Sequence, residues 1–199
     1  MVGSLLLKSF VFQAFYVPSS SMENTLQVSD RFFVSRMGGE IRHGDIVVFY
    51  DAAGWMADSD YDAALRSNAW TRFLKMNGFI PSQNNEVMVK RAIGLPGDTV
   101  ACCNAHQQVT VNGVGLDERY LQDGMLPSAI RFEVTVPEAK LFLMGDNRAH
   151  SADSRRFLDH PSGGFVRQED VIGRAVATVW PVANATWHRT PVELMQASP

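Results

Sequence analysis

Short runs of β-branched and aromatic residues, separated by turn residues, extend along most of this 199-residue chain. Runs of this length, bounded by glycine, proline, asparagine and aspartate, are typical of β-strands. They cover residues 31–36, 46–50, 87–93, 99–102, 108–111, 114–116, 131–136, 140–144 and 171–179. Asn112-Gly113, between two of these runs, is a strong signal for a tight hairpin. The pattern predicts a mainly β fold of short antiparallel strands.

Residues 51–86 interrupt this pattern with a mixed, turn-rich composition, which we interpret as a partly helical insertion between two core strands. Between residues 59 and 76, apolar side chains recur at helical spacing. We predict that part of the insertion docks on lipid as an interfacial element. The alternative is that its apolar side chains cover the β core, because amphipathic helices usually pack inward. The side chains concerned are Trp55, Leu65, Trp70, Phe73 and Leu74.

The N-terminal residues 4–17 are apolar but contain Lys8 and Gln13. A helix that spans a bilayer needs about 20 predominantly apolar residues, and this run is shorter. It also lacks an Ala-x-Ala cleavage site, so it makes a poor signal peptide. Two interpretations stay open. Residues 1–16 are the outer end of a truncated transmembrane anchor, or residues 10–17 form a buried N-terminal strand.

Composition excludes some classes of function. The formal net charge of -3 argues against a nucleic-acid partner, because no basic surplus is present to displace counterions. The five histidines are scattered without ligand spacing, so we expect no metal site. Cys102 and Cys103 are adjacent and cannot close an ordinary disulfide loop. We expect two thiols on opposite faces of a strand, which leaves the redox compartment undecided.

Three consecutive serines and one lysine suggest catalysis. Ser19, Ser20 and Ser21 follow an apolar run and a proline. A serine is a good nucleophile only when a base removes its proton, and no histidine here has a context typical of a Ser-His-Asp triad. Lys90 lies in an apolar, strand-like run, where burial can lower the usual lysine pKa of about 10.4 by about 3 to 5. The alternatives are a helix N-cap for the serines and an exposed strand position for the lysine.

Three motifs in this order resemble those of the bacterial type I signal (leader) peptidases, a Ser-Lys protease family. They are SMENTL at 21–26, KRAIGLPGD at 90–98 and GDNRAHSADSR at 145–155. Between them they frame most of the chain from residue 15 to residue 181. One departure is visible, because Asn24 stands where many members of the family have proline.

The resemblance implies a role for several matched residues. Ser21 is the nucleophile that attacks the scissile carbonyl, and Lys90 is the general base that later activates water for deacylation. The backbone N–H of Ser21 and the Ser19 hydroxyl form the oxyanion hole. Ser151 orients the lysine amine. Arg91, next to Lys90, is expected to face solvent because a guanidinium cannot be deprotonated.

The same resemblance implies supporting and substrate-binding residues. Asp153 and Arg155 form a structural ion pair in the third motif, with Asp146 and Arg148 supporting it. An extended peptide is expected to pair with strand edges near the dyad. Shallow apolar pockets would then admit only small residues at positions -1 and -3 of the signal peptide. The candidate lining residues are Phe15, Val17, Ile93 and Met144.

The resulting prediction is a membrane-associated serine endopeptidase that removes N-terminal signal peptides from exported preproteins through an acyl-enzyme, without cofactor or metal. Its catalytic β domain spans 17–182, with the insertion at 51–86 and a C-terminal tail at 183–199. We expect it to be anchored in the cell membrane, with the catalytic domain on the extracytoplasmic face and the active site near the bilayer surface.

Two other functions are compatible with parts of this pattern. Another Ser-Lys protease, such as a self-cleaving repressor or a dedicated processing enzyme, would share the dyad. A repressor also needs a helix-turn-helix domain, for which the chain before Ser21 is too short. A non-catalytic, membrane-bound peptide-binding module would be expected to have lost Ser21 or Lys90, and the chain has both.

Overall fold

The computed structural model describes residues 12–37, 39–56 and 87–188. Its strands are β1 (Phe12–Tyr16), β2 (Arg31–Ser35), β3 (Ile46–Tyr50), β4 (Val87–Gly94), β5 (Thr99–Cys102), β6 (Val109–Val111), β7 (Val114–Gly115), β8 (Phe132–Thr135), β9 (Lys140–Met144), β10 (Val166–Arg167), β11 (Val171–Trp180) and β12 (Thr186–Trp187). The helices within these ranges are short 3₁₀ turns: η1 (Ser20–Met22), η2 (Ser154–Phe157), η3 (Gln168–Asp170) and η4 (Val182–Asn184). None of them is long and apolar enough to cross a membrane.

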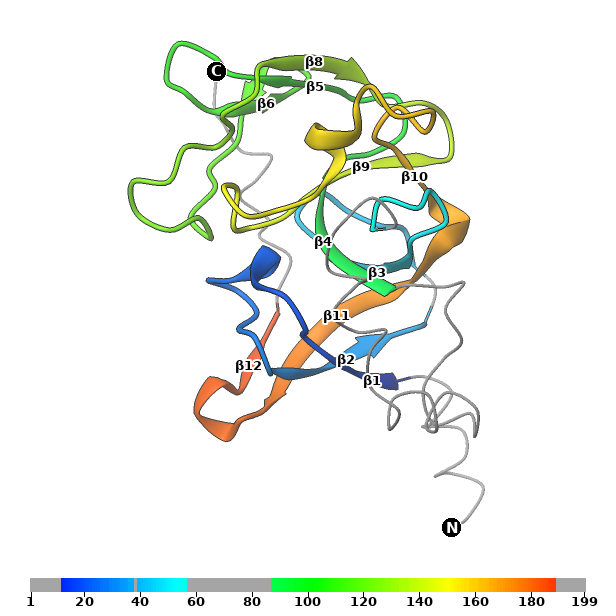
Figure 1. Ribbon diagram of the computed structural model, residues 1–199, viewed down its shortest axis with the longest axis vertical. Coiled ribbons are helices and arrows are strands. Elements are labelled where there is room, and N and C mark those ends of the chain that lie inside the picture. Colours follow the sequence, from blue (N-terminus) through cyan, green and yellow to red (C-terminus); the bar gives the residue numbers. More distant parts are fainter. Residues whose placement is uncertain (1–11, 38, 57–86, 189–199) are drawn as a thin grey trace.

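The strands form two antiparallel sheets. The larger sheet has the order β1-β2-β11-β3-β4-β9-β10, and β12 pairs with β11. The smaller sheet has the order β7-β6-β5-β8 and lies at the opposite end of the molecule from β1, β2 and β12 (Figure 1). The prediction of a mainly β fold is therefore confirmed.

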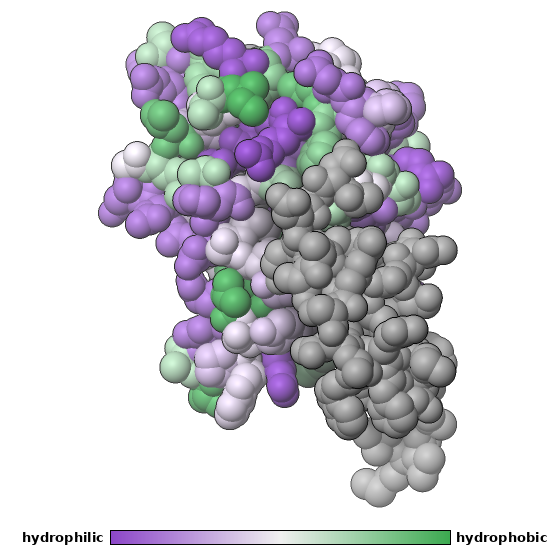
Figure 2. Space-filling view, in the orientation of Figure 1, coloured by the Kyte–Doolittle hydropathy of each residue, from purple (hydrophilic) through white to green (hydrophobic). Residues whose placement is uncertain are grey.

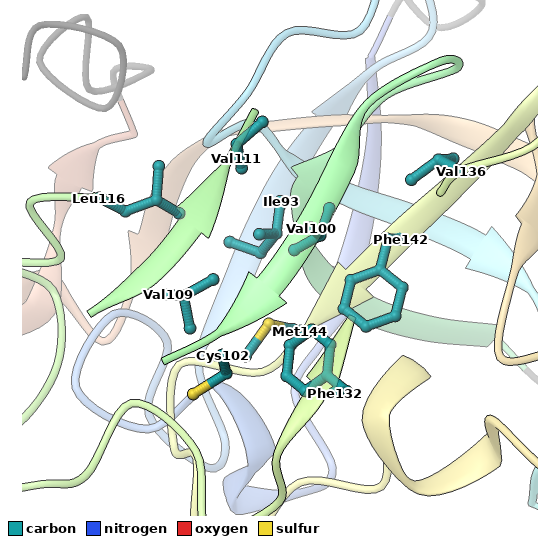
Figure 3. Close-up of a cluster of buried hydrophobic side chains, with 10 residues drawn as sticks. All are labelled: Ile93, Val100, Cys102, Val109, Val111, Leu116, Phe132, Val136, Phe142 and Met144. Atoms are coloured by element: carbon teal, nitrogen blue, oxygen red, sulfur yellow. The ribbon is translucent and has the colours of Figure 1, made fainter. Parts of the chain in front are cut away.

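A buried cluster joins the two sheets where the smaller sheet packs against β4 and β9 (Figure 3). Its members are Ile93, Val100, Cys102, Val109, Val111, Leu116, Phe132, Val136, Phe142 and Met144. Burial of each large apolar side chain stabilises the fold by about 1.5–3 kcal/mol. This cluster fixes β4 and β9, which carry or deliver the second and third motifs.

The two cysteines differ from the prediction of separate thiols on opposite faces of a strand. The sulfur atoms of Cys102 and Cys103 are bonded to each other. Strand β5 ends at Cys102, so the alternation of side chains that the prediction assumed does not continue to Cys103.

Trp55 belongs to the core, so the prediction that it contacts lipid is wrong. The Asp51 carboxylate accepts hydrogen bonds from the backbone N–H groups of Trp55 and Met56, at 2.9 and 2.8 Å, which turns the chain back after β3. The indole stacks on Phe157 with 4.8 Å between ring centroids and meets Phe49 edge-on. The other apolar side chains proposed for lipid contact, and the helix expected at 59–76, lie outside the described residues.

β1 lies at the edge of the larger sheet and pairs antiparallel with β2. A strand is therefore present at 12–16, but it is mostly exposed rather than buried, because it has a neighbour on only one side. Phe15 is its most enclosed residue and stacks on Phe32 at 6.0 Å. The anchor was one prediction for residues 1–16; of these, residues 12–16 form this strand and residues 1–11 lie outside the described residues.

Candidate active site

Ser21 lies in η1, in a segment held by buried apolar side chains on both sides. Val17 before it and Met22 and Leu26 after it belong to one core cluster. Ser21 itself is 7% exposed. Ser19 occupies the N-cap position of η1, but its side chain makes no capping hydrogen bond there. Its Oγ lies 3.4 Å from Ser21 Oγ, so the two hydroxyls face each other.

Lys90 reaches Ser21 from the middle of β4. Its Nζ donates a hydrogen bond to Ser21 Oγ at 2.6 Å, and the residue is 3% exposed. In the sheet, Lys90 is paired with Val47 of β3. The fold thus brings together two residues that are 69 positions apart in the chain, as the first and second motifs predict.

The environment of Lys90 favours the neutral amine. Burial lowers its pKa from 10.5 to about 8, although the nearby carboxylates of Asp153 and Asp146 act in the opposite direction. The charge of Arg155 adds a smaller lowering. At pH 8 about half of the Lys90 amines would be neutral, against well under 1% for a solvated lysine. A neutral amine in contact with a serine hydroxyl can accept its proton.

Arg91 is also buried, so the prediction that it faces solvent is wrong. β4 lies between β3 and β9, and packing covers it everywhere except at Val87. The Arg91 guanidinium donates to both oxygens of Asp146, at 2.8 and 2.5 Å, and to the Gly44 carbonyl at 2.8 Å. The Thr25 hydroxyl donates to the same carboxylate at 2.5 Å. One buried ion pair therefore connects all three motifs.

Asp153 and Arg155 form a two-pronged ion pair within the third motif. Arg155 Nε and Nη2 donate to the two carboxylate oxygens of Asp153 at 2.9 and 2.7 Å. The backbone N–H of Gly145 donates to the same carboxylate at 3.0 Å. Burial alone would raise the pKa of Asp153, but its hydrogen bonds and ion pair with Arg155 outweigh this and hold the pKa below its usual value. The carboxylate therefore remains charged and holds its loop in place.

Arg148 supports the third motif through its backbone and through its side chain, whose Nε donates to the Gly145 carbonyl at 3.0 Å. Its carbonyl accepts a hydrogen bond from Arg155 Nη2 at 3.0 Å. Its guanidinium forms a buried ion pair with Glu118, which also receives the Tyr120 hydroxyl at 2.7 Å. Glu118 and Tyr120 were not predicted as part of the site, because residues 117–128 contain no motif or periodicity that points to them.

The third-motif loop lies directly against the backbone of Ser21. The Asn147 N–H donates to the Ser21 carbonyl at 3.1 Å. A Cβ added to Gly145 would lie 2.5 Å from that carbonyl oxygen and would also overlap the side chain of Ser151. Only glycine can therefore occupy position 145 without displacing the loop.

Ser151 lies behind this loop and is buried. Its Oγ makes no hydrogen bond of regular geometry among the described residues, and the expected one to the Lys90 amine is absent there; the hydroxyl is close enough to Asp153 to help lower the pKa of that carboxyl. Orientation of Lys90 by Ser151 stays a prediction.

The residues proposed to line substrate pockets differ in accessibility. Phe15 exposes part of its ring beside Ser21's segment. Val17, Ile93 and Met144 are fully enclosed in core clusters and present almost no accessible surface of their own. These three residues are buried because they pack within the core clusters, and side chains enclosed in this way do not form the wall of an open pocket.

The groups that meet at the site are two serine hydroxyls and one lysine amine. In the part of the chain that is described, no group of three or more His, Cys, Asp or Glu residues could hold a metal ion. The buried Ser21 hydroxyl contacts the Lys90 amine, whose pKa is lowered, and also lies beside the Ser19 hydroxyl. Such a set supports base-assisted nucleophilic attack on an acyl group.

Comparisons with known proteins point to one family. The model of the family described as signal peptidase, peptidase S26, matches residues 1–180. The signal peptidase I of Mycobacterium tuberculosis H37Rv is 36% identical over 199 residues, which cover 87% of this chain and 66% of that protein. The signal peptidase I of Leptolyngbya laminosa is 35% identical over 185 residues, which cover 92% of this chain and 75% of that protein.

A solved structure is also similar in sequence. It is the crystal structure of a signal peptidase I from Enterococcus faecalis V583, with 26% identity over 68% of this chain and 97% of that one. Its TM-score of 0.42 is too low to support a structural comparison. The chain spans just under two thirds of the length of the mycobacterial relative.

Proposed function

Because the chain belongs to the signal peptidase (peptidase S26) family, we propose that it is a serine endopeptidase that removes N-terminal signal peptides from exported preproteins. The observation that carries this proposal is the 2.6 Å contact between Lys90 Nζ and Ser21 Oγ in a buried site. The motif order and the family membership support the same assignment. No cofactor takes part in the proposed reaction.

The proposed reaction begins with neutral Lys90. Its amine accepts the Ser21 proton while Ser21 Oγ attacks the carbonyl at the end of the signal peptide. The oxyanion is stabilised by the Ser21 N–H and the Ser19 hydroxyl, which lies beside the reacting oxygen. Protonated Lys90 then gives its proton to the leaving amine of the mature protein. In deacylation, Lys90 removes a proton from water while the water oxygen attacks the acyl ester. The ester bond to Ser21 Oγ then breaks, and Lys90 returns the proton to Ser21 Oγ, which regenerates both residues.

The substrate in this proposal is an extended chain with small residues at -1 and -3. Strand-like pairing gives affinity through backbone hydrogen bonds, and side-chain pockets give specificity. Of the four residues predicted to bind substrate, Phe15 is the one whose side chain is partly exposed, and it lies shortly before the serine segment. Replacing alanine at -1 of a test peptide with a large residue should abolish cleavage, whereas replacement at -2 should not.

The proposed enzyme acts at the extracytoplasmic surface of a membrane. One face of the larger sheet supports the contact with a membrane surface. Paired residues of neighbouring antiparallel strands project on the same face. The pairings Tyr16–Arg31–Trp180 and Phe33–Ala177–Trp187 therefore place aromatic rings together. The aromatic face consists of Phe12, Tyr16, Phe33, Trp180 and Trp187, which are 40% to 75% exposed.

This face has the composition of an interfacial surface. Tryptophan and tyrosine favour the zone between lipid headgroups and acyl chains. Arg31 lies on the same face and would favour anionic headgroups. The aromatic face includes β1, which leads directly into the Ser21 segment, so docking would bring the dyad close to the membrane where a signal peptide emerges. Of the strands concerned, β1, β2 and β12 lie in the lower part of the coloured ribbon in Figure 1.

Vesicle sedimentation tests the membrane part of the proposal. The wild-type protein should bind vesicles that contain phosphatidylglycerol more tightly than vesicles of phosphatidylcholine. Replacing Trp180 and Trp187 together by alanine should weaken binding at least about tenfold, since each ring loses apolar burial. Leu126→Ala removes an apolar side chain that is similarly exposed but lies in the β7–β8 loop, so it should leave binding unchanged. Equal binding by the double variant would refute the assignment of this face.

Peptide cleavage tests the dyad. Wild type should cleave a synthetic signal-peptide junction at the alanine bond, and Ser21→Ala and Lys90→Ala should each abolish turnover while the protein remains folded. The double variant should be hardly worse than either single one, because residues that act as a unit are not additive. Activity that persists in folded Lys90→Ala would rule out the proposed mechanism.

A further inference from the structure

The loop between β7 and β8, residues 116–131, is fastened to the catalytic motifs at two places. The Tyr120 ring lies under the Arg91 guanidinium, with 3.9 Å from Arg91 Cζ to the ring centroid. Glu118 forms a buried ion pair with Arg148. Arg148 also donates to the Pro127 carbonyl at 2.7 Å, further along the same loop. The β7–β8 loop is thus a fixed element beside the dyad.

Asn24 connects the serine segment to this loop. It has a φ of 91°, in the left-handed region that asparagine, aspartate and glycine tolerate best. Its side-chain Nδ2 donates to the Tyr120 carbonyl at 2.9 Å. Proline could not occupy this position, because its ring holds φ near -65°. The backbone conformation and the hydrogen bond therefore depend on the residue type.

The neighbours of Asn24 are also tied to catalytic segments. Glu23 receives a hydrogen bond from the Asn147 side chain at 3.3 Å, and Thr25 donates to Asp146 at 2.5 Å. These two contacts hold the turn against the third motif. Asn24, between them, holds it against the β7–β8 loop. Three successive side chains thus fix the segment that follows Ser21.

We infer that Asn24 is a positioning residue, whose hydrogen bond to the Tyr120 carbonyl holds Ser21 in register with Lys90. The inference rests on the proposed function and adds to it a residue outside the dyad and its ion pairs. Loss of the Nδ2 donor would release the turn from the β7–β8 loop. Ser21 Oγ and Lys90 Nζ would then spend less time at the 2.6 Å distance that proton transfer requires.

Two substitutions remove the donor and keep the backbone conformation. Asn24→Asp has nearly the same shape and tolerates positive φ, but its carboxylate cannot donate to a carbonyl. Asn24→Gly tolerates positive φ and removes the side chain. Asn112→Gly is the matched control, because Asn112 has a φ of 53° and its Nδ2 donates to Asp98 at 2.8 Å in the hairpin turn of the smaller sheet.

Steady-state cleavage of the synthetic junction peptide should separate positioning from binding. In Asn24→Asp and Asn24→Gly, kcat should fall by about tenfold with KM within about twofold, since misalignment of reacting groups slows chemistry more than it weakens binding. Asn112→Gly should match wild type in both constants. Unchanged kcat in both Asn24 variants, an equal loss of kcat in the control, or a rise in KM alone would each overturn the inference.

Amide hydrogen exchange tests, independently of catalysis, whether the Asn24 hydrogen bond holds the β7–β8 loop. Exchange in a peptide that covers 117–128 should be faster in both Asn24 variants than in wild type or Asn112→Gly, and equal exchange would overturn the inference. If wild type showed no Ser21-dependent cleavage, the proposed function would fail, while the exchange result would still decide whether Asn24 holds the loop.

Discussion

Replacing Lys90 by methionine should stabilise the protein at neutral pH, even though it removes the proposed catalytic base. Lys90 is 3% exposed, and burial is the main cause of its lowered pKa. The folded protein therefore holds the charged amine less favourably than the unfolded chain does. Methionine is apolar and of similar length, so it fills the same space without this cost.

The magnitude follows from the two pKa values. The pKa is 10.5 for the unperturbed lysine and about 8 in the fold. At 1.36 kcal/mol for each pKa unit, this difference costs about 3 kcal/mol of stability below pH 8. The hydrogen bond to Ser21 that methionine cannot make offsets about 1 kcal/mol. Lys90→Met should therefore be about 2 kcal/mol more stable than wild type at pH 7.

The sign of the pH dependence is fixed by proton binding. Between pH 8 and 10.5 the unfolded chain binds the Lys90 proton more fully than the folded protein does, so this group makes stability rise with pH over that window. As pH rises, the free energy of unfolding of wild type should approach that of Lys90→Met, and near pH 10.5 it should equal or exceed it.

Urea denaturation at a series of pH values from 6 to 10.5 measures this difference. Comparing the two proteins at each pH cancels the titration of other groups. Lys140→Met is the control, because Lys140 is only partly buried in β9 and its amine lies 6.0 Å from the centre of the Phe165 ring. A stability difference between wild type and Lys90→Met that stays constant from pH 7 to 10.5 would refute the desolvation argument.

Two further substitutions test the scaffold of the site. Gly145→Ala should lower the free energy of unfolding by about 1–3 kcal/mol and should also slow peptide cleavage, because its Cβ would overlap Ser151. Urea denaturation and kcat measure the two effects, and wild-type values in both would contradict the prediction. Arg91→Met should destabilise by about 3–5 kcal/mol, because it leaves the Asp146 carboxylate buried without its ion-pair partner. Arg167 is exposed, so Arg167→Met should lower stability far less than Arg91→Met, and a similar loss in both would contradict the burial argument.

Much of the fold could be predicted from local sequence. The runs at 46–50, 99–102 and 140–144 match β3, β5 and β9 residue for residue. Alternating or continuous apolar residues bounded by turns are a local signal, and the sheet pairs them accordingly. The two-residue strands β10 and β12 were not predicted, because they lack a neighbouring hairpin signal such as the Asn112-Gly113 turn that marked the equally short β7.

The proximity of Ser21 and Lys90 could be predicted only because their motifs resemble a known family. The burial of Arg91 could not, because alternation along β4 assumes one solvent face. The packing on both sides of this strand comes from distant segments. The burial of Trp55 could not be predicted either, because its stacking partner Phe157 lies more than a hundred residues away in the chain. The contacts of Tyr120 also depend on tertiary structure alone.

The dependence of kcat/KM on pH tests most directly whether Lys90 is the base of Ser21. For wild type and a synthetic signal-peptide junction, kcat/KM should rise with pH and level off through an apparent pKa of about 8, as the free enzyme's lysine loses its proton. Lys90→Arg, which keeps a charge that cannot be removed, should show no activity at any pH. A wild-type profile that climbs to pH 10 without an inflection, or activity in Lys90→Arg, would contradict the account.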